Sequence, residues 1–90
     1  MADMELQAGE EVLLEIDRHF EGDAELYVLR VGRFQDPGTG KWRRARLEKR
    51  RFQREGDRWV RGKPLTLIAP DIRQVAEKRD DILRAMGDIA

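Results

Sequence analysis

The chain has 90 residues, no cysteine, and 18 basic and 18 acidic residues, so its formal net charge is zero. A chain of this length forms one domain (residues 1–90) with a small core, and without cysteine neither disulfides nor a thiolate metal cluster can stabilise it. No segment approaches the roughly 20 apolar residues of a membrane span. The acidic start lacks the apolar run of a secretory signal. We therefore expect a cytoplasmic protein without a membrane partner, with residues 1–10 forming a flexible acidic N-terminus.

The charges are unevenly distributed along the chain. Residues 1–29 carry nine acids and one base, residues 30–63 carry thirteen bases and four acids, and residues 64–90 carry four bases and five acids. A middle third with a net charge of +9 (13 − 4) is typical of a segment that contacts a polyanion. The alternative is a solvated basic surface that the acidic N-terminal third neutralises.

Turn-forming residues divide the chain into predicted strands. Glu-Gly-Asp occurs at 21–23 and at 55–57, and Asp-Pro-Gly-Thr-Gly occupies 36–40. The stretches between these turns predict strands over 12–20, 26–34, 41–52 and 59–68. Apolar spacing in the first stretch also fits a helix, but the turn that follows favours a hairpin and hence a strand. Pro64 in the last stretch requires an edge, a bulge or a kink.

The C-terminal segment predicts one amphipathic helix. Pro70 suits a first helical turn, Asp71 complements the helix dipole there, and Gly87 supplies a stop. Apolar residues recur at helical spacing and form one stripe, interrupted by Arg79: Ile72, Val75, Ala76, Ile82, Leu83 and Met86. The predicted fold is therefore α+β, a four-stranded antiparallel meander sheet followed by one C-terminal amphipathic helix. So long a stripe in so short a chain predicts a homodimer formed through this helix.

Alternation along the third predicted strand separates two faces. One face carries Trp42, Arg44, Arg46, Glu48, Arg50 and Phe52, and the other, with Ala45 and Leu47, is expected to pack on the helix. Because a core would bury three arginines without partners, the first face is expected to be exposed. Trp42 and Phe52 would then stack with bases while the arginines contact phosphates. The alternative is that these rings only pack under the arginine stems.

From residue 46 onward the order of features resembles the positive-cofactor-four family of transcriptional coactivators. The matching pieces are the basic strand at 47–52, the Glu-Gly-Asp turn, Arg-Gly-Lys-Pro-Leu-Thr-Leu at 61–67 and Pro-Asp-Ile at 70–72. The chain departs from the family at Pro64, where glycine is usual, and at Ile72, where an aromatic residue is common. The resemblance implies a homodimer whose helices pack together and whose sheets hold single strands in basic, aromatic-lined channels.

The predicted contact residues combine alternation with this resemblance. By position, the resemblance places Lys49, Arg51, Phe52, Trp59, Arg61 and Lys63 in or beside the channel, and alternation alone splits them between two faces. Trp59, Arg61 and Lys63 share one face of the fourth predicted strand. The complete predicted set is Lys41, Trp42, Arg44, Arg46, Lys49, Arg50, Arg51, Phe52, Trp59, Arg61 and Lys63.

These patterns predict a homodimeric binder of single-stranded DNA or RNA, with little sequence preference, that acts as an accessory factor in transcription, replication or repair. The alternative is a protein-interaction module whose basic sheet docks an acidic protein partner and is masked by the acidic N-terminal third when free. A lone histidine, His19, and the absence of cysteine argue against a metal site. The chain has neither a phosphate-binding loop motif nor a nucleophile elbow, so no enzyme activity and no cofactor are expected.

Overall fold

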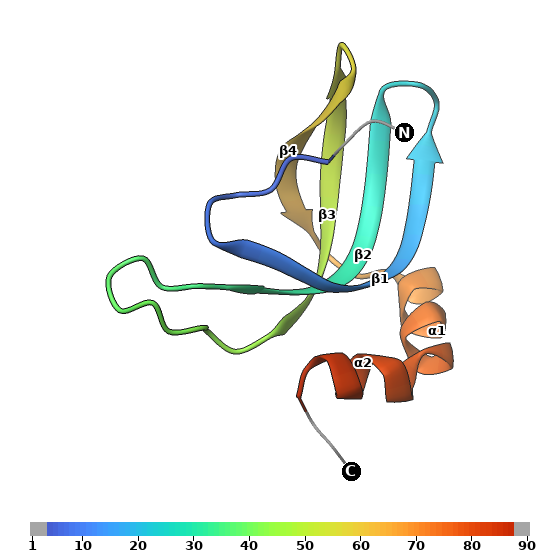
Figure 1. Ribbon diagram of the computed structural model, residues 1–90. Helices are drawn as coiled ribbons and strands as arrows, with labels where there is room; N and C mark the ends of the chain where they lie inside the picture. Colours follow the sequence, from blue (N-terminus) through green and yellow to red (C-terminus); the bar gives the residue numbers. More distant parts are fainter. Residues whose placement is uncertain (1–3, 88–90) are drawn as a thin grey trace.

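The computed structural model describes residues 4–87. Within these residues the chain forms an antiparallel sheet of four strands, paired in the order β1-β2-β3-β4, followed by two short helices (Figure 1). The elements are β1 (Glu10–Glu21), β2 (Glu25–Phe34), β3 (Arg46–Glu55), β4 (Arg58–Leu65), α1 (Ala69–Glu77) and α2 (Arg79–Ala85). The predicted α+β class and the meander order of the strands are confirmed.

Glycines at positive φ close the β1–β2 and β3–β4 hairpins. Gly22 has φ 63° and Gly56 has φ 62°, a backbone conformation that residues with a Cβ seldom adopt. Both glycines lie in the Glu-Gly-Asp triplets, so the predicted hairpin turns are confirmed. The ambiguous stretch 12–20 lies in β1 and is a strand, not a helix.

The third and fourth strands are shorter than predicted. Pairing of β2 with β3 ends at Gly32 opposite Arg46, so the prediction that the strand begins at residue 41 is wrong, and residues 35–45 leave the sheet. β4 ends just after Pro64, not at residue 68. Proline has no N–H for the ladder, and it is tolerated here because β4 is the last strand in the sheet order.

Bulges curve the sheet. The register of β1 against β2 shifts between residues 12 and 14 and again between 15 and 17, and Figure 1 shows β1 turning sharply along its length. β4 bulges at Gly62 and Lys63, which lie opposite Arg51 of β3, and a Cβ added to Gly62 would lie 2.7 Å from the Arg51 carbonyl oxygen. The curved sheet has an inner face, crossed by residues 4–9, and an outer face that packs against the helices.

Each face of the sheet carries a hydrophobic cluster. On the outer face the buried residues are Ile16, Leu29, Val31 and, from α2, Ile82. Ala45 and Leu47 pack against this cluster, so the prediction that their face meets the helical segment is confirmed. On the inner face Met4 packs against four buried residues: Leu26, Val28, Phe52 and Trp59.

Among residues 4–87 the helical segment forms two short helices, so the prediction of one continuous helix is wrong. The chain leaves helical geometry at Lys78, with φ −107° and ψ 19°. Arg79 interrupts the apolar stripe, and the break beside it lets Ile82 enter the outer-face core. The predicted stripe is therefore divided: Ile82 is buried, Val75 and Leu83 are half-buried, and Ile72, Ala76 and Met86 are exposed. Neither of these helices combines the length and apolar character that crossing a membrane requires.

Helix α1 begins as the sequence predicts, with Pro70 and Asp71 in its first turn. An Oδ2 atom of Asp71 accepts hydrogen bonds from the Ile68 backbone N–H at 2.8 Å and from Nζ of Lys49 at 2.9 Å. Burial alone would raise the pKa of Asp71, but these hydrogen bonds and the charge of Lys49 outweigh it and lower the pKa from its ordinary value of 3.8. The ionised carboxylate therefore ties α1 to β3.

Asp71→Asn should lower the free energy of unfolding by about 1.5–3 kcal/mol at pH 7, the usual value of a hydrogen bond to a charged group. Because the folded-state pKa is depressed, the contribution of Asp71 is complete above its ordinary pKa of 3.8 and is lost as the pH falls through the folded value. Urea unfolding at pH 7 and between pH 5 and pH 2 measures both effects. Asp81→Asn is the control, since its ion pair with Arg84 is exposed. An Asp71→Asn deficit that is as large at pH 2 as at pH 7 would contradict this assignment.

Candidate nucleic-acid interface

Residues 35–45 form an arm that projects from the sheet between β2 and β3 (Figure 1). Its tip is an ordered turn, because Oδ1 of Asp36 accepts hydrogen bonds from the backbone N–H groups of Gly38 at 2.8 Å and Thr39 at 3.2 Å. These hydrogen bonds lower the pKa of Asp36. Below the tip, the N–H of Asp36 donates to the carbonyl of Lys41 at 2.7 Å. The arm is therefore a closed hairpin-like loop that holds the residues after the turn beside those before it.

Trp42 lies near the base of this arm with its side chain partly in solvent. It pairs with Gln35 in a β-bridge and is 41% exposed. The guanidinium of Arg33 lies over the ring, 4.0 Å from its centroid, and pairs with Glu11 at 2.9 Å. Trp42 thus offers an ordered, solvent-accessible ring at the edge of a basic segment.

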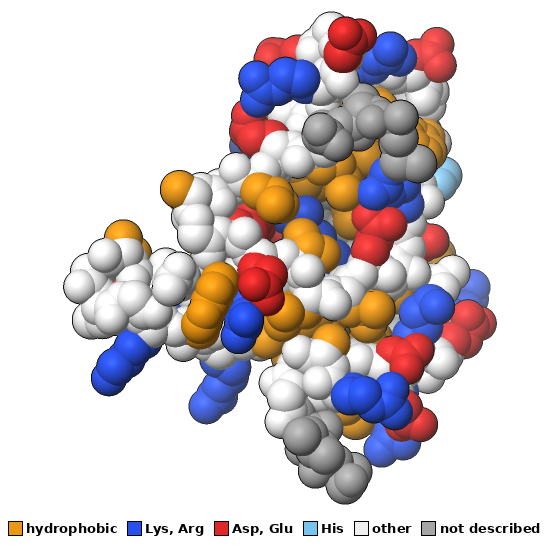
Figure 2. Space-filling view, viewed as in Figure 1, with side chains coloured by type: hydrophobic (Ala, Val, Ile, Leu, Met, Phe, Trp, Pro, Cys, Tyr) orange, Lys and Arg blue, Asp and Glu red, His pale blue; other side chains and the backbone are white. Residues whose placement is uncertain are grey.

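Cations that form no ion pair within the described residues flank Trp42 along the chain. Lys41, Arg44 and Arg46 are exposed and form no ion pair within the described residues, and Arg46 lies over the ring of Phe34 at 5.5 Å. Arg43 is 70% exposed and reaches Asp36 only at 3.6 Å. Figure 2 shows Lys and Arg side chains projecting from the arm, at the left, away from the body of the molecule. With five bases and one acid, residues 33–46 carry a net charge of +4 (5 − 1).

The inner sheet face is not the exposed basic surface that alternation predicts. Phe52 has no exposed surface and Trp59 is 6% exposed, so the prediction that Phe52 stands on an exposed face is wrong. Arg30, Arg50 and Arg61 on this face pair with carboxylates inside the fold, which removes the reason for expecting the whole face to be exposed. Their carboxylate partners, Glu10 and Glu48, come from β1 and β3.

Arg30 lies at the centre of this ion-pair network and is wholly buried. Its guanidinium contacts Glu10 at 3.0 Å and Glu48 at 3.1 Å. Arg61 contacts Glu10 at 2.9 Å, and Arg50 contacts Glu48 at 3.2 Å. Burial alone would raise the pKa of Glu48, but hydrogen bonds and charges from Arg50 and Arg30 outweigh it and lower the pKa. Two carboxylates thus hold three guanidinium groups in this network of described residues.

The structure therefore divides the predicted contact set. Lys41, Trp42, Arg44 and Arg46 come together on and beside the arm. Lys63 is exposed on β4, apart from them in the sheet. The remaining predicted residues either form ion pairs within the fold or are buried in it: Lys49, Arg50, Arg51, Phe52, Trp59 and Arg61.

Sequence reasoning missed Arg33 and Arg43, which join the arm cluster. The signal was the turn at 36–40, because a hairpin closing around it places the residues before the turn beside those after it. Reading residues 41–52 as one straight strand obscured that relation.

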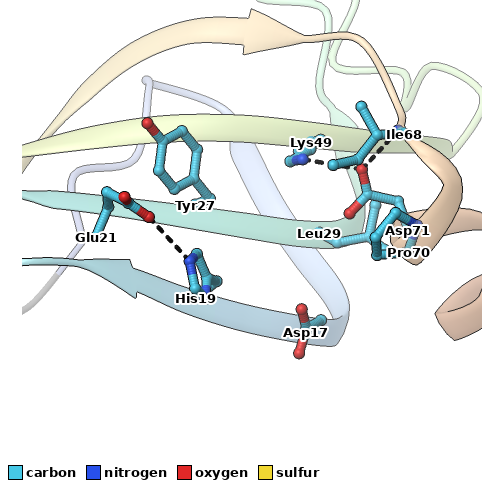
Figure 3. Close-up of a pocket in the computed structure, with 9 residues that line it drawn as sticks. All are labelled: Asp17, His19, Glu21, Tyr27, Leu29, Lys49, Ile68, Pro70 and Asp71. Carbon is cyan, nitrogen blue, oxygen red and sulfur yellow. Dashed lines mark hydrogen bonds and ion pairs between the residues drawn. The ribbon is translucent and has the colours of Figure 1, made fainter.

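A pocket of about 530 Å³ lies on the outer face where α1 meets the sheet (Figure 3). The rings of His19 and Tyr27 stack at 6.2 Å, and Figure 3 shows Lys49 paired with Asp71 at the opposite end. The hydroxyl of Tyr27 donates to Glu25 at 2.7 Å, which raises the pKa of Tyr27. Three carboxylates line the pocket, from Asp17, Glu21 and Asp71, against one lysine, so it suits a polyanion poorly.

Within residues 4–87, no three side chains of the metal-binding types cluster closely enough to hold an ion. Comparison with models of protein families, with curated proteins and with solved structures finds no match to this chain.

Proposed function

We propose that this protein binds single-stranded nucleic acid through the arm, acting by binding rather than by catalysis. The observation that supports this most is an exposed tryptophan, Trp42, with three cations within four residues of it along the chain that form no ion pair among residues 4–87. Cations that follow a phosphate backbone, interleaved with a ring on which a base stacks, are the recurring components of single-strand binding. The sheet supplies a rigid base from which the arm projects.

Each component has a separate role in this proposal. Lys41, Arg44 and Arg46 contact phosphates, and Arg33 holds the Trp42 ring in a fixed orientation. Since any base has a flat face, sequence preference should be slight, as suits an accessory factor in transcription, replication or repair. The resemblance of the segment after residue 46 to the positive-cofactor-four family favours the same ligand, although most of the arm lies outside the matching pieces.

Replacing Lys41 and Arg44 together with glutamine should flatten the salt dependence of oligo-dT binding. Each neutralised phosphate contributes about 0.7 to the slope of log K against log salt for a single strand, so the slope should fall by about 1.4. Titrations of the parent and the variant at several salt concentrations measure it. Arg73→Gln with Arg79→Gln is the matched control, because both residues are exposed on the helical segment and form no ion pair within residues 4–87. A full slope in the arm variant would place the phosphate contacts elsewhere.

An acidic protein partner is the rival occupant, because a carboxylate-rich peptide would also neutralise the arm. Base stacking distinguishes the two ligands. Oligo-dT should quench the fluorescence of the exposed Trp42 by stacking on its ring, whereas a polyglutamate peptide should compete only weakly at physiological salt. Tight binding of the peptide without any binding of oligo-dT would favour the interaction module.

We further propose that the protein is a homodimer that pairs through the helical end of the molecule. Ile68 and Ile72 expose 56% and 54% of their surfaces beside the start of α1. Exposed large apolar residues this close together are usual at interfaces between subunits. The continuous stripe cannot be the interface, since Ile82 belongs to the protomer's own core.

Ile72→Asp should give a monomer of unchanged fold, because the new charge would be buried in the interface but exposed in the free protomer. Light scattering measures the mass, and circular dichroism checks the fold. Ile82→Asp is the contrasting variant and should unfold the protomer. A parent of monomer mass, or an Ile72→Asp variant of dimer mass, would contradict this interface.

A further inference from the structure

Residues 4–9 cross the inner face of the sheet, and we call this segment the strap. Figure 1 shows it running from the N-terminal end of the described chain across β4 before it turns into β1. Met4 forms a parallel β-bridge with Trp59, and the N–H of Glu5 donates to the carbonyl of Trp59 at 2.9 Å. The carboxylate of Glu5 pairs with Arg58 at 2.8 Å. The strap therefore places a negative charge on the basic strand β4.

Beneath the strap lie aromatic and basic groups of the kind that bind single strands. Met4 packs against the cluster that contains Phe52 and Trp59. Arg61 follows the alternation of Trp59 along β4, and its backbone N–H donates to the Glu5 carboxylate at 3.4 Å. In Figure 2 this side of the molecule shows hydrophobic side chains beside both cationic and acidic ones. The strap thus occupies the rings and cations that a single strand would use.

This face is continuous with the arm. The ring of Phe34 lies between the guanidinium groups of Arg46 and Arg61, at 5.5 Å and 5.8 Å. At the strap's other end, the carbonyl of Gly9 accepts a hydrogen bond from the N–H of Gln35 at 2.9 Å. A strand bound along the arm would therefore meet the strap next.

The strap is held less firmly than the strands beside it. Apart from Met4 and Glu5, its residues are exposed, and Leu6 has 48% of its surface in solvent. Gly9 has φ 78° and forms the turn into β1. A segment with few buried contacts and exposed hydrogen bonds opens at low free-energy cost.

We propose that the same single strand also binds the inner sheet face beneath the strap. The strap and the single strand then compete for this face. The inference rests on the function proposed above. Binding at the arm brings phosphates to β4, where they replace the carboxylate of Glu5 on Arg58. The strap then swings away about Gly9, leaving the buried network of Glu10 and Arg30 in place.

Glu5→Gln should tighten oligo-dT binding about twofold to fivefold, the range expected for releasing an exposed ion pair. Glu15→Gln is the matched control, since it also removes one charge from an ion pair, with Arg18, and the two glutamates are 35% and 37% exposed. Equal affinities for the two variants would overturn the inference.

Amide hydrogen exchange supplies a second readout. With saturating oligo-dT, the Glu5 amide should lose protection while the β2–β3 ladder keeps its own. Unchanged protection at Glu5, with binding that still depends on Lys41 and Arg44, would overturn the strap inference and leave the arm proposal intact. Absence of binding by both the parent and Glu5→Gln would overturn both. Binding by Glu5→Gln alone would support the strap inference and remove the arm as the primary site.

Discussion

Glu10→Ala should lower the free energy of unfolding by about 3–5 kcal/mol, the usual cost of removing one partner from a buried ion pair. The Glu10 side chain is 2% exposed and contacts both Arg30 and Arg61. Arg30 has no exposed surface, and its Nη1 atom already lacks a hydrogen-bond partner among the described residues. The substitution would leave the Arg30 guanidinium with Glu48 alone and the Arg61 guanidinium with no carboxylate partner among the described residues. Urea unfolding followed by circular dichroism measures the loss.

The neighbouring residue provides the control. Glu11 pairs with Arg33 at 2.9 Å, but the two side chains are 43% and 33% exposed. Glu11→Ala should therefore cost only about 0–1 kcal/mol. If the two substitutions shift the unfolding midpoint equally, the network around Arg30 does not stabilise the fold. A domain of this size has about 5–15 kcal/mol of stability, so the Glu10 variant should be largely or partly unfolded under mild denaturation.

Trp42→Ala should weaken oligo-dT binding about fivefold to a hundredfold, corresponding to about 1–3 kcal/mol for one stacked base. The salt slope should stay nearly unchanged, because the substitution removes no charge. The fold should persist, since Trp42 belongs to neither hydrophobic cluster of residues 4–87. Fluorescence anisotropy of labelled oligo-dT measures the affinity after circular dichroism has confirmed the fold.

A conservative substitution separates stacking from a general disturbance of the arm. Trp42→Phe keeps a flat ring under Arg33 and should retain most of the affinity. A folded Trp42→Ala variant that binds as tightly as the parent would show that this ring is not a stacking platform.

Local patterns predicted much of the architecture. The Glu-Gly-Asp triplets around Gly22 and Gly56 predict where the hairpins form. Each turn needs a positive φ at one residue, and glycine adopts that conformation readily. Alternation correctly assigned Ala45 and Leu47 to the face that meets the helical segment. Pro70 and Asp71 located the start of α1, since first-turn preferences act within a few residues.

The exposure of the inner face could not be predicted in the same way. Alternation shows which residues share a face, but whether that face is covered depends on distant segments. Glu10 lies 20 residues from Arg30 and 51 from Arg61, so no local pattern signals that these charges pair. The basic middle third therefore predicts one exposed surface, although much of its charge is neutralised inside the fold. Within residues 4–87, Lys41, Arg44 and Arg46 on and beside the arm form no ion pair with a carboxylate.

The bound edge of β4 has a consequence for how the protein behaves at high concentration. An outermost strand exposes backbone groups that can recruit a strand from another molecule, the first step of sheet extension and aggregation. In the described chain, the bridge from Met4 occupies one end of this edge at Trp59, and Pro64 near the other end offers no N–H to an incoming strand. The Met4 bridge and Pro64 therefore protect opposite ends of β4 from pairing with another strand. Any ligand that lifts the strap also opens the Trp59 end of that edge to pairing with a neighbouring molecule.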